Sequence, residues 1–513
     1  MAWLRGLLAA RGSDDGSGEP SSASLPAFLP ALVVATLYLI VSLRTTEFRR
    51  LFEIDPDEGN NLIKALLLDR GHGFLSEIWS DQPPLFAYVL WGAFELFGWK
   101  VGVAREIVLG CSALLVFAIY DSVRLATERA AGSIAAHLGA LLSVVLLSFA
   151  SGFAVLRVSV MIGLPAIALA ALAVWLALSA GELAQRRAPR ERRYWLLAAG
   201  GVLGLSLGTK LFTGFLLPVV AATALWPELR DLRRRGPKPA LIPAAWFTLG
   251  FAVVLFVALA PALFSGALSE LYLAHAAASS REYRSIHTVQ SLMARDVVIY
   301  ALAVAGLGLA LYQRAVAALP WALWLVLALA VLSRHDPLWG HHNQLLVVPG
   351  CALAGVAVAL SAPLLPERER APGMASVAIV VLVLLAVSAG DRWEQLRKPY
   401  GRDDARERAA LDALQSLGVR DGYVVSARQI YAFYLGLPVP PLLSVTSAKR
   451  FRSGRLSAPE ILKQIEQHRA ELVILSDRWS AAVRDRVRRG ISRKYELVHQ
   501  DRGNHRLEVY RRR

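Results

Sequence analysis

Long apolar segments separated by short polar turns fill the chain between residues 25 and 390. The first, Leu25–Leu43, holds about 19 residues, which is enough for a helix to cross the hydrocarbon core of a bilayer. Further segments of this kind lie at residues 103–123, 132–150, 158–180, 194–209, 211–226, 243–264, 297–312, 316–332, 345–362 and 374–390. This pattern predicts a mainly α-helical polytopic membrane protein with about 11 transmembrane helices.

The pattern changes after residue 390. Short β-rich runs at residues 422–427, 471–476, 495–499 and 506–510 alternate there with helical stretches at residues 403–417, 429–435, 461–469 and 479–489. Such alternation predicts a small α/β domain outside the membrane. The predicted organisation is an N-terminal tail at residues 1–24, a transmembrane domain at residues 25–390 and an extramembrane domain at residues 391–513.

Basic residues set the expected orientation of the chain. Of its 513 residues 55% are hydrophobic, and the net charge is +16. Dense positive turns at residues 185–193 and 230–238 lie between apolar segments, which fits the positive-inside rule better than a nucleic-acid surface. The N-terminus is then cytoplasmic, and the first polar loop, residues 45–102, and the C-terminal domain face outward. The chain has no Asn-X-Ser/Thr sequon, which favours a bacterial inner membrane and a periplasmic outer side.

Four acids in the first polar loop lie beside predicted membrane helices, namely Asp55, Asp57, Glu58 and Asp81. Charges at such positions are costly unless they have a function. The alternative is helix capping, because acids in a first turn suit the helix dipole, and Asp55-Pro56 fits the start of a helix. Asp55-Pro56-Asp57 also has the Asp-X-Asp spacing that could hold a divalent metal. The sequence leaves these alternatives open.

Candidate cations and imidazoles occur in outward-facing turns far apart in the sequence. They are Arg157, Lys210, Arg281, Arg284, Arg334, His341 and His342. For most of them the alternative is that they are polar only because surface loops contact water. Lys210 is different because it stands alone between two apolar segments, where a lone cation should face a cavity or a bound anion.

Several motifs follow one another in a distinctive order. They are Asp57-Glu58 after the first span, Asp81-Gln-Pro-Pro-Leu85, Gly98, Arg105, Arg157 before the fourth span, Gly204 to Lys210, and His341-His342 ahead of an apolar segment. This order, which covers roughly residues 25–360, resembles the GT-C glycosyltransferases. The resemblance is closest to the protein-mannosyltransferase and aminoarabinose-transferase-like group.

The resemblance implies a glycosyltransferase that uses a polyprenyl-phosphate-linked sugar and an acceptor on the outer side of the membrane. It implies that Asp57 is the base, with Glu58 beside it, and that Asp81 is a further catalytic acid. Many members carry a donor-contacting Lys where this chain has Gln82, so other cations must bind the phosphate. The residues predicted to bind the substrate and its phosphate are therefore Gln82, Arg105, Arg157, Lys210, Arg281, Arg284, Arg334, His341 and His342. Membrane transferases with Asp-Glu openings generally need no metal, as the resemblance implies.

The chemistry fits one carboxylate and a cluster of cations. A phosphate-linked sugar already has a good leaving group, so cations must stabilise the phosphate and a base must activate the incoming hydroxyl or amine. Direct displacement of this kind inverts the anomeric centre. The acceptor is an envelope glycan, a lipid or a protein, and nucleic acid is not an expected partner. Two alternatives remain, a transporter or lipid flippase and a non-catalytic relative whose tail binds a partner.

Overall fold

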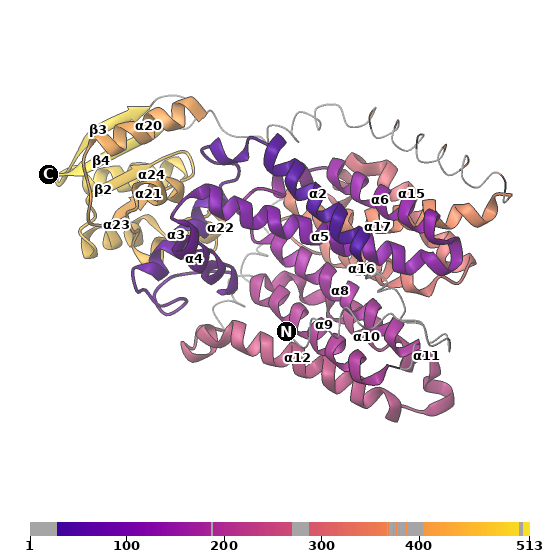
Figure 1. The fold of residues 1–513 in the computed structure, drawn as a ribbon. Coiled ribbons are helices and arrows are strands. Elements are labelled where there is room, and N and C mark those ends of the chain that lie inside the picture. Colours follow the sequence, from indigo (N-terminus) through magenta and orange to yellow (C-terminus); the bar gives the residue numbers. More distant parts are fainter. Residues whose placement is uncertain are drawn as a thin grey trace.

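A computed structural model describes residues 28–185, 188–268, 287–366, 404–501 and 506–513, together with single positions between 368 and 386. Figure 1 shows a bundle of long helices with a small domain containing a sheet at one end. The first polar loop lies where these two parts meet, next to the small domain (Figure 1). This loop carries the predicted acids, so its surroundings decide what the site can do.

Each predicted span within the described residues overlaps an α-helix. These helices are α2 (Leu29–Thr45), α5 (Val101–Ala131), α6 (Ser133–Phe149), α8 (Gly163–Gln185), α9 (Pro189–Thr209), α10 (Leu217–Ala224), α12 (Lys238–Phe264), α15 (Val297–Tyr312), α16 (Leu319–Leu332) and α17 (Gln344–Ser361). Within the described ranges, 5 helices are long and apolar enough to cross a membrane, or up to 6 if a bent pair counts as one span. The predicted span at residues 374–390 lies outside the fully described residues, so about 11 spans stays a prediction.

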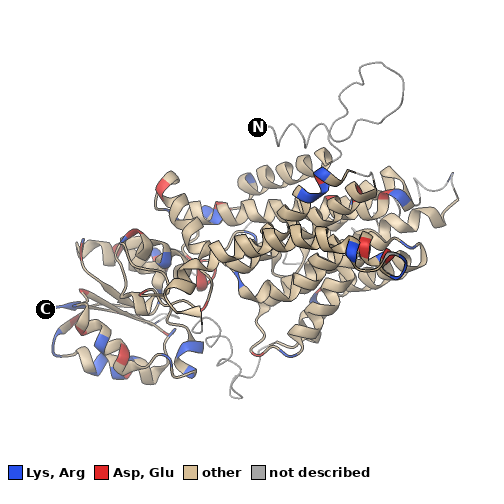
Figure 2. Ribbon diagram, turned by 90° about the horizontal axis from the view of Figure 1, so that it is seen from below, with Lys and Arg blue, Asp and Glu red and all other residues tan. Residues whose placement is uncertain are grey.

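Shorter helices join these long ones. They are η1 (Phe48–Arg50), α3 (Asp57–Asp69), α4 (Leu85–Phe97), α7 (Phe153–Leu156), η2 (Leu211–Leu216), α11 (Trp226–Arg235), α14 (Val289–Met293), η4 (Ala294–Asp296), η5 (Val316–Ala318), η6 (Gly340–Asn343) and η7 (Ala362–Leu364). Charged ribbon segments gather at the small domain and at the opposite end of the bundle (Figure 2). Long uncharged stretches of helix lie between them, as a lipid environment requires (Figure 2).

Two predicted spans are interrupted. The span expected at residues 158–180 begins only at Gly163, after the single turn of α7 and a non-helical segment at residues 157–162. The span expected at residues 211–226 starts as the 3-10 helix η2, continues as α10, and bends by 60° into α11. The first interruption contacts the first polar loop, because the Val160 N–H donates to Glu58 and the Val160 carbonyl oxygen accepts from Asn61. Backbone that leaves a helix at membrane depth is tolerated where it is buried in protein or lines a cavity.

Glycines allow the long helices to approach closely. A Cβ atom added at Gly250 of α12 would lie 2.0 Å from the carbonyl oxygen of Leu197 in α9. One added at Gly139 of α6 would lie 2.4 Å from the carbonyl oxygen of Gly355 in α17. Small residues at helix crossings are typical of membrane bundles, in which van der Waals contact replaces the hydrophobic effect.

Helix α3 is amphipathic as predicted. Its apolar residues Leu62, Ile63, Leu66 and Leu67 are all buried. The residue before the helix is Pro56, and Asp55 Oδ1 accepts a hydrogen bond of 2.9 Å from the backbone N–H of Asp57. The helix therefore begins where the Asp55-Pro56 pair predicted.

The small domain has the predicted mixture of helices and strands. Its elements are α20 (Asp404–Ser416), β1 (Val424–Ser426), α21 (Gln429–Leu435), η9 (Pro441–Leu443), α22 (Ala448–Arg452), α23 (Ala458–Gln467), β2 (Leu472–Leu475), α24 (Ala481–Ile491), β3 (Tyr495–Asp501) and β4 (Leu507–Arg512). The strand order is β1-β2-β4-β3, with β1 parallel to β2 and the other pairs antiparallel. Residues 424–426 and 472–475 are fully buried, as short continuous apolar strands predict.

Helix α21 packs directly on α3 and ties the small domain to the first polar loop. A Cβ added at Gly59 would lie 2.4 Å from the backbone nitrogen of Ile430. The Phe52 ring lies 5.1 Å from that of Tyr431 and 5.0 Å from that of Tyr434. Tyr434 also donates a hydrogen bond of 3.0 Å to the carbonyl oxygen of Phe52. Only a glycine at position 59 permits so close an approach.

A buried ion network reinforces this junction. Arg428 donates to Glu407 at 2.6 Å and to Glu53 at 2.7 Å, and all three side chains are almost fully buried. Tyr431 donates a hydrogen bond to the same Glu407. Because Glu53 belongs to the first polar loop, this network fixes the small domain over that loop.

Candidate active site

The acids Asp57 and Asp81 lie close enough to repel each other. Asp57 is in the first turn of α3, and Asp81 lies in the turn ahead of α4. Asn60 donates a hydrogen bond of 3.2 Å to Asp57 Oδ1. Lys64, seven positions after Asp57 on the same helix face, interacts electrostatically with both acids. The first polar loop therefore supplies both acids and one cation.

The surroundings raise the pKa of the first acids. Asp57 keeps an exposed face, but the enclosing protein and then the charge of Asp81 raise the pKa of its carboxyl above the ordinary 3.8. Burial, followed by repulsion from Asp57, raises the pKa of Asp55 to about 7. Burial lowers the pKa of the Lys64 ammonium, against the opposing effect of Asp81 and Asp57. A carboxylate whose pKa lies nearer to neutral is a better proton acceptor.

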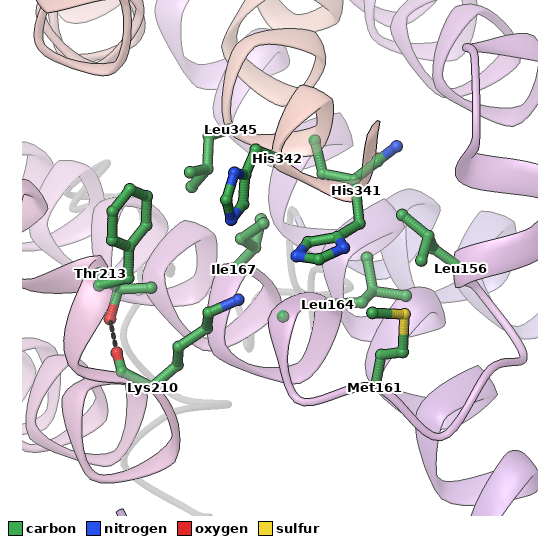
Figure 3. Close-up of a pocket in the computed structure, with 12 residues that line it drawn as sticks. Leu156, Met161, Leu164, Ile167, Lys210, Thr213, His341, His342 and Leu345 are labelled. Carbon is green, nitrogen blue, oxygen red and sulfur yellow. Dashed lines mark hydrogen bonds between the residues drawn. The ribbon is translucent and has the colours of Figure 1, made fainter. Parts of the chain in front are cut away.

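A narrow, mostly apolar pocket that is partly open to solvent begins at Lys210. Figure 3 shows the Lys210 ammonium directed into this pocket, toward His341 and near Ile167. A Cβ at Gly163 would lie only 3.6 Å from the Lys210 nitrogen. Lys210 also interacts electrostatically with Asp57 and Asp81. It therefore links the acid pair to the pocket.

Histidines and an aromatic ring form one wall of this pocket. The ring of His342 stacks on Phe212 at 5.5 Å and lies 4.6 Å from the ring of His341. His335 lies 5.0 Å from His342 and 4.8 Å from Phe212. The helix break at η2 and the helix start at η6 bring these residues together from distant parts of the sequence.

Glu58 and Arg105 do not face this site. Their side chains are fully buried against each other, with Arg105 donating to Glu58 at 3.0 and 2.6 Å. Arg105 also donates to the carbonyl oxygens of residues 48 and 51. Glu58 accepts two backbone N–H groups, from Ile54 at 2.8 Å and from Val160 at 2.9 Å. This geometry favours a structural role, in contrast to the catalytic and phosphate-binding roles that the sequence predicted.

Other predicted cations lie in different surroundings. Arg157 is buried and donates to the hydroxyls of Ser42 and Thr46 at 2.8 Å, so it anchors the end of α2. Arg334 is exposed, and its guanidinium lies 3.4 Å from the carbonyl oxygen of residue 330. Arg281 and Arg284 lie outside the described residues.

Gln82 is held by its backbone and keeps a buried amide oxygen. Its N–H donates to Ser80 Oγ at 3.1 Å, and that hydroxyl donates to the Gln82 carbonyl at 2.9 Å. The side-chain Oε1 is buried and has no hydrogen-bond partner among the described residues. Position 82 therefore brings no charge to the site.

Sequence reasoning missed three basic residues near the acids. Lys64 was recoverable, because it follows Asp57 at helical spacing. Lys449 and Arg478 come from the small domain, where no local pattern distinguishes them from surface residues. Lys449 lies 3.7 Å from Asp81, and Arg478 interacts electrostatically with Asp57. In the described part of the chain, no group of His, Cys, Asp and Glu is arranged to hold a metal ion.

Comparisons with known proteins agree with this architecture. Residues 81–263 match the family model of dolichyl-phosphate-mannose-protein mannosyltransferases. No curated protein sequence matches the chain. The crystal structure of ArnT from Cupriavidus metallidurans in the apo state is similar, with a TM-score of 0.60 and 16% identity over 94% of this chain and 97% of that one.

Two further structures share the fold. ArnT from Cupriavidus metallidurans bound to undecaprenyl phosphate has a TM-score of 0.58 and 16% identity, with the same coverage of 94% and 97%. The Archaeoglobus fulgidus oligosaccharyltransferase tethered with an acceptor peptide has a TM-score of 0.51 and 12% identity, over 88% of this chain and 69% of that one. The resemblance to GT-C glycosyltransferases that the motifs predicted is thus confirmed in the fold.

Proposed function

We propose that this multi-pass membrane protein, which has the GT-C fold, is an inverting glycosyltransferase that uses a polyprenyl-phosphate-linked sugar. The sugar passes to an acceptor on the periplasmic side of a bacterial inner membrane. One observation carries the proposal: the acid pair Asp57 and Asp81 is linked by Lys210 to a narrow apolar pocket. This combination offers a base, a cation and an apolar surface at one place, which a lipid-linked phosphate donor needs.

The geometry supports a direct displacement. Asp57 accepts the proton of the acceptor hydroxyl or amine, whose oxygen or nitrogen forms a bond to the anomeric carbon. The bond from that carbon to the phosphate oxygen breaks on the opposite face, so the anomeric configuration inverts. The bonding electrons leave with the phosphate, and Lys210 stabilises the added negative charge. Asp81 raises the pKa of Asp57 and so makes it a stronger base.

The pocket suits the donor rather than the acceptor. Its walls carry the apolar residues Met161, Leu164, Ile167 and Leu345, which match a lipid chain, while Lys210 stands at the phosphate end. The ArnT structure with undecaprenyl phosphate supports a donor of this class. The acceptor, an envelope glycan, a lipid or a protein, then approaches from the side of the acid pair.

Asp57→Asn tests the role of the base. We expect the variant to fold and to bind undecaprenyl phosphate, and its transfer rate to fall by about a hundredfold or more. The assay follows consumption of a polyprenyl-phosphate sugar by the purified protein in nanodiscs, with envelope extract as acceptor. Asp69→Asn, an exposed acid at the other end of α3, is the matched control. Near-normal turnover in Asp57→Asn would remove Asp57 as the base.

The proposed orientation is tested by labelling in intact cells. Cysteine at position 77, where the Glu77 side chain is 54% exposed, should react with a membrane-impermeant maleimide from outside. Cysteine at position 230, where the Arg230 side chain is 69% exposed, should react only after the cells are opened. The background variant replaces Cys111 and Cys351, which lie within helices α5 and α17. Reversed labelling would place the site in the cytoplasm.

A further inference from the structure

We propose that the C-terminal domain completes the donor site, and that Lys449 of α22 binds the phosphate of the polyprenyl-linked donor. The inference rests on the proposed glycosyltransferase function and assigns to it a residue from a separate part of the chain. Lys449 Nζ lies 3.7 Å from Asp81 Oδ2. The two side chains are 28% and 20% exposed, so both remain accessible from solvent.

The placement of Lys449 is built into the junction between the two parts of the protein. The next residue, Arg450, lies with its guanidinium 4.0 Å from the centre of the Trp79 ring. The Trp79 N–H donates to the carbonyl oxygen of Pro441 at 3.1 Å. Ser444 donates to the Trp79 carbonyl oxygen at 2.6 Å. Trp79, two residues before Asp81, thus contacts Pro441 and Ser444 in the segment that leads to α22 and also contacts Arg450, the residue after Lys449. These contacts hold the two charged side chains near each other.

Arg450 is itself rigidly held, which makes α22 a firm support. It is buried and donates to the carbonyl oxygens of Leu442 at 2.6 Å and Val445 at 2.8 Å. A short helix of five residues would otherwise have little stability of its own. The hydrogen bonds of Arg450 hold α22 in place and so keep the neighbouring Lys449 in a defined position near Asp81.

The side chains around Asp57 and Asp81 carry an excess of positive charge, which a bound anion could balance. Three ammonium groups, of Lys64, Lys210 and Lys449, surround the carboxylates of Asp57 and Asp81. Lys210 and Lys449 are close enough to repel each other. A phosphate between these two lysines would relieve that repulsion and balance the excess positive charge.

The charge change of the reaction gives Lys449 a specific role. The donor is a phosphodiester with one negative charge, and the leaving polyprenyl phosphate is a monoester with nearly two. A second cation therefore stabilises the phosphate more as the bond to the sugar breaks. Lys210 at the pocket and Lys449 from the small domain would share the added charge.

The test measures binding of undecaprenyl phosphate to the full-length protein in nanodiscs. We expect Lys449→Met to weaken binding by about ten- to hundredfold, the typical effect of losing a hydrogen bond between charged groups. Lys449→Arg should retain most of the affinity because it retains the cation. Lys463→Met, an exposed lysine of α23 in the same domain, should bind like the wild type. In turnover, Lys449→Met should lower kcat more than it raises KM.

The outcomes separate this inference from the proposed function. Wild-type protein that binds no undecaprenyl phosphate would overturn both. Wild-type binding with unchanged affinity in Lys449→Met would overturn the role of Lys449 alone. Thermal unfolding of each variant in the same nanodiscs identifies a folding defect, and Lys449→Gln, which preserves a polar side chain, then takes the place of Lys449→Met. Equal losses in Lys449→Met and Lys463→Met would also overturn the inference.

Discussion

Replacing Arg105 by methionine should destabilise the protein strongly. The change leaves the Glu58 carboxylate buried with two backbone N–H donors and without its counter-charge. Removing one partner of a fully buried ion pair costs about 3–5 kcal/mol. The carbonyl oxygens of Phe48 and Leu51, which accept from Arg105 at 2.8 and 2.6 Å, also lose their donor. These losses share one site, so they do not simply add.

Thermal unfolding in detergent, read by tryptophan fluorescence, measures the effect. Arg49→Met is the matched control, because Arg49 and Glu106 form an ion pair with side chains 48% and 44% exposed. Such an exposed pair contributes about 0–1 kcal/mol. We therefore expect a large fall in unfolding temperature for Arg105→Met and almost none for Arg49→Met.

A double variant sharpens the test. Glu58→Leu combined with Arg105→Met removes both charges. The loss of stability in this double variant should therefore be smaller than the sum of the losses in the two single variants. It should still be less stable than the wild type, because the backbone groups of residues 48, 51, 54 and 160 lose partners. An Arg105→Met protein that unfolds like the wild type but transfers no sugar would refute the structural role and restore the phosphate-binding role.

Two further predictions concern the acid pair and the helix packing. The base must be deprotonated, so kcat/KM should rise with pH through the raised pKa of Asp57, and Asp81→Asn should move this rise to lower pH by removing a repelling charge. A rise centred near the ordinary 3.8, or one unmoved in Asp81→Asn, would contradict this assignment. Gly250→Ile should lower the unfolding temperature, because its Cβ would lie 2.0 Å from the backbone of Leu197. Gly110→Ile, where a Cβ meets nothing within 4 Å, should leave it unchanged, and equal melting of both variants would show that α9 and α12 tolerate separation.

The elements of the fold were readable from the sequence because each depends on nearby residues. Apolar length predicted the long helices, and the alternation after residue 390 predicted all four strands. The prediction for residues 429–435 matches α21 residue for residue. The break at Lys210 was predicted, since α9 ends at Thr209. The errors occurred at residues 158–162, which precede the start of α8, and at residues 211–216, which form a 3-10 helix although their composition is apolar. Composition does not register such breaks, since a cavity rather than a local pattern supports them.

The candidate site was only partly readable. Asp57, Asp81 and Lys210 were selected because each is a charge next to apolar segments, and the structure brings these three together. Adjacent residues on a helix point about 100° apart, and here Asp57 is exposed while Glu58 is buried. The sequence did not show which of the two acids is buried, because the partner of Glu58 is Arg105 of another helix.

Sequence alone therefore determined that this protein is a bundle of apolar helices with an α/β domain, and that acids follow its first helix. Hydrophobic periodicity and the residues that start and end helices and strands are local properties of the chain, so a single sequence is enough to identify them. Only the tertiary structure decided that Lys449 meets Asp81 and that Arg428 joins the small domain to Glu53. Electrostatic partners are set by distance in space, and buried packing between α21 and α3 brings together charges from opposite ends of the chain.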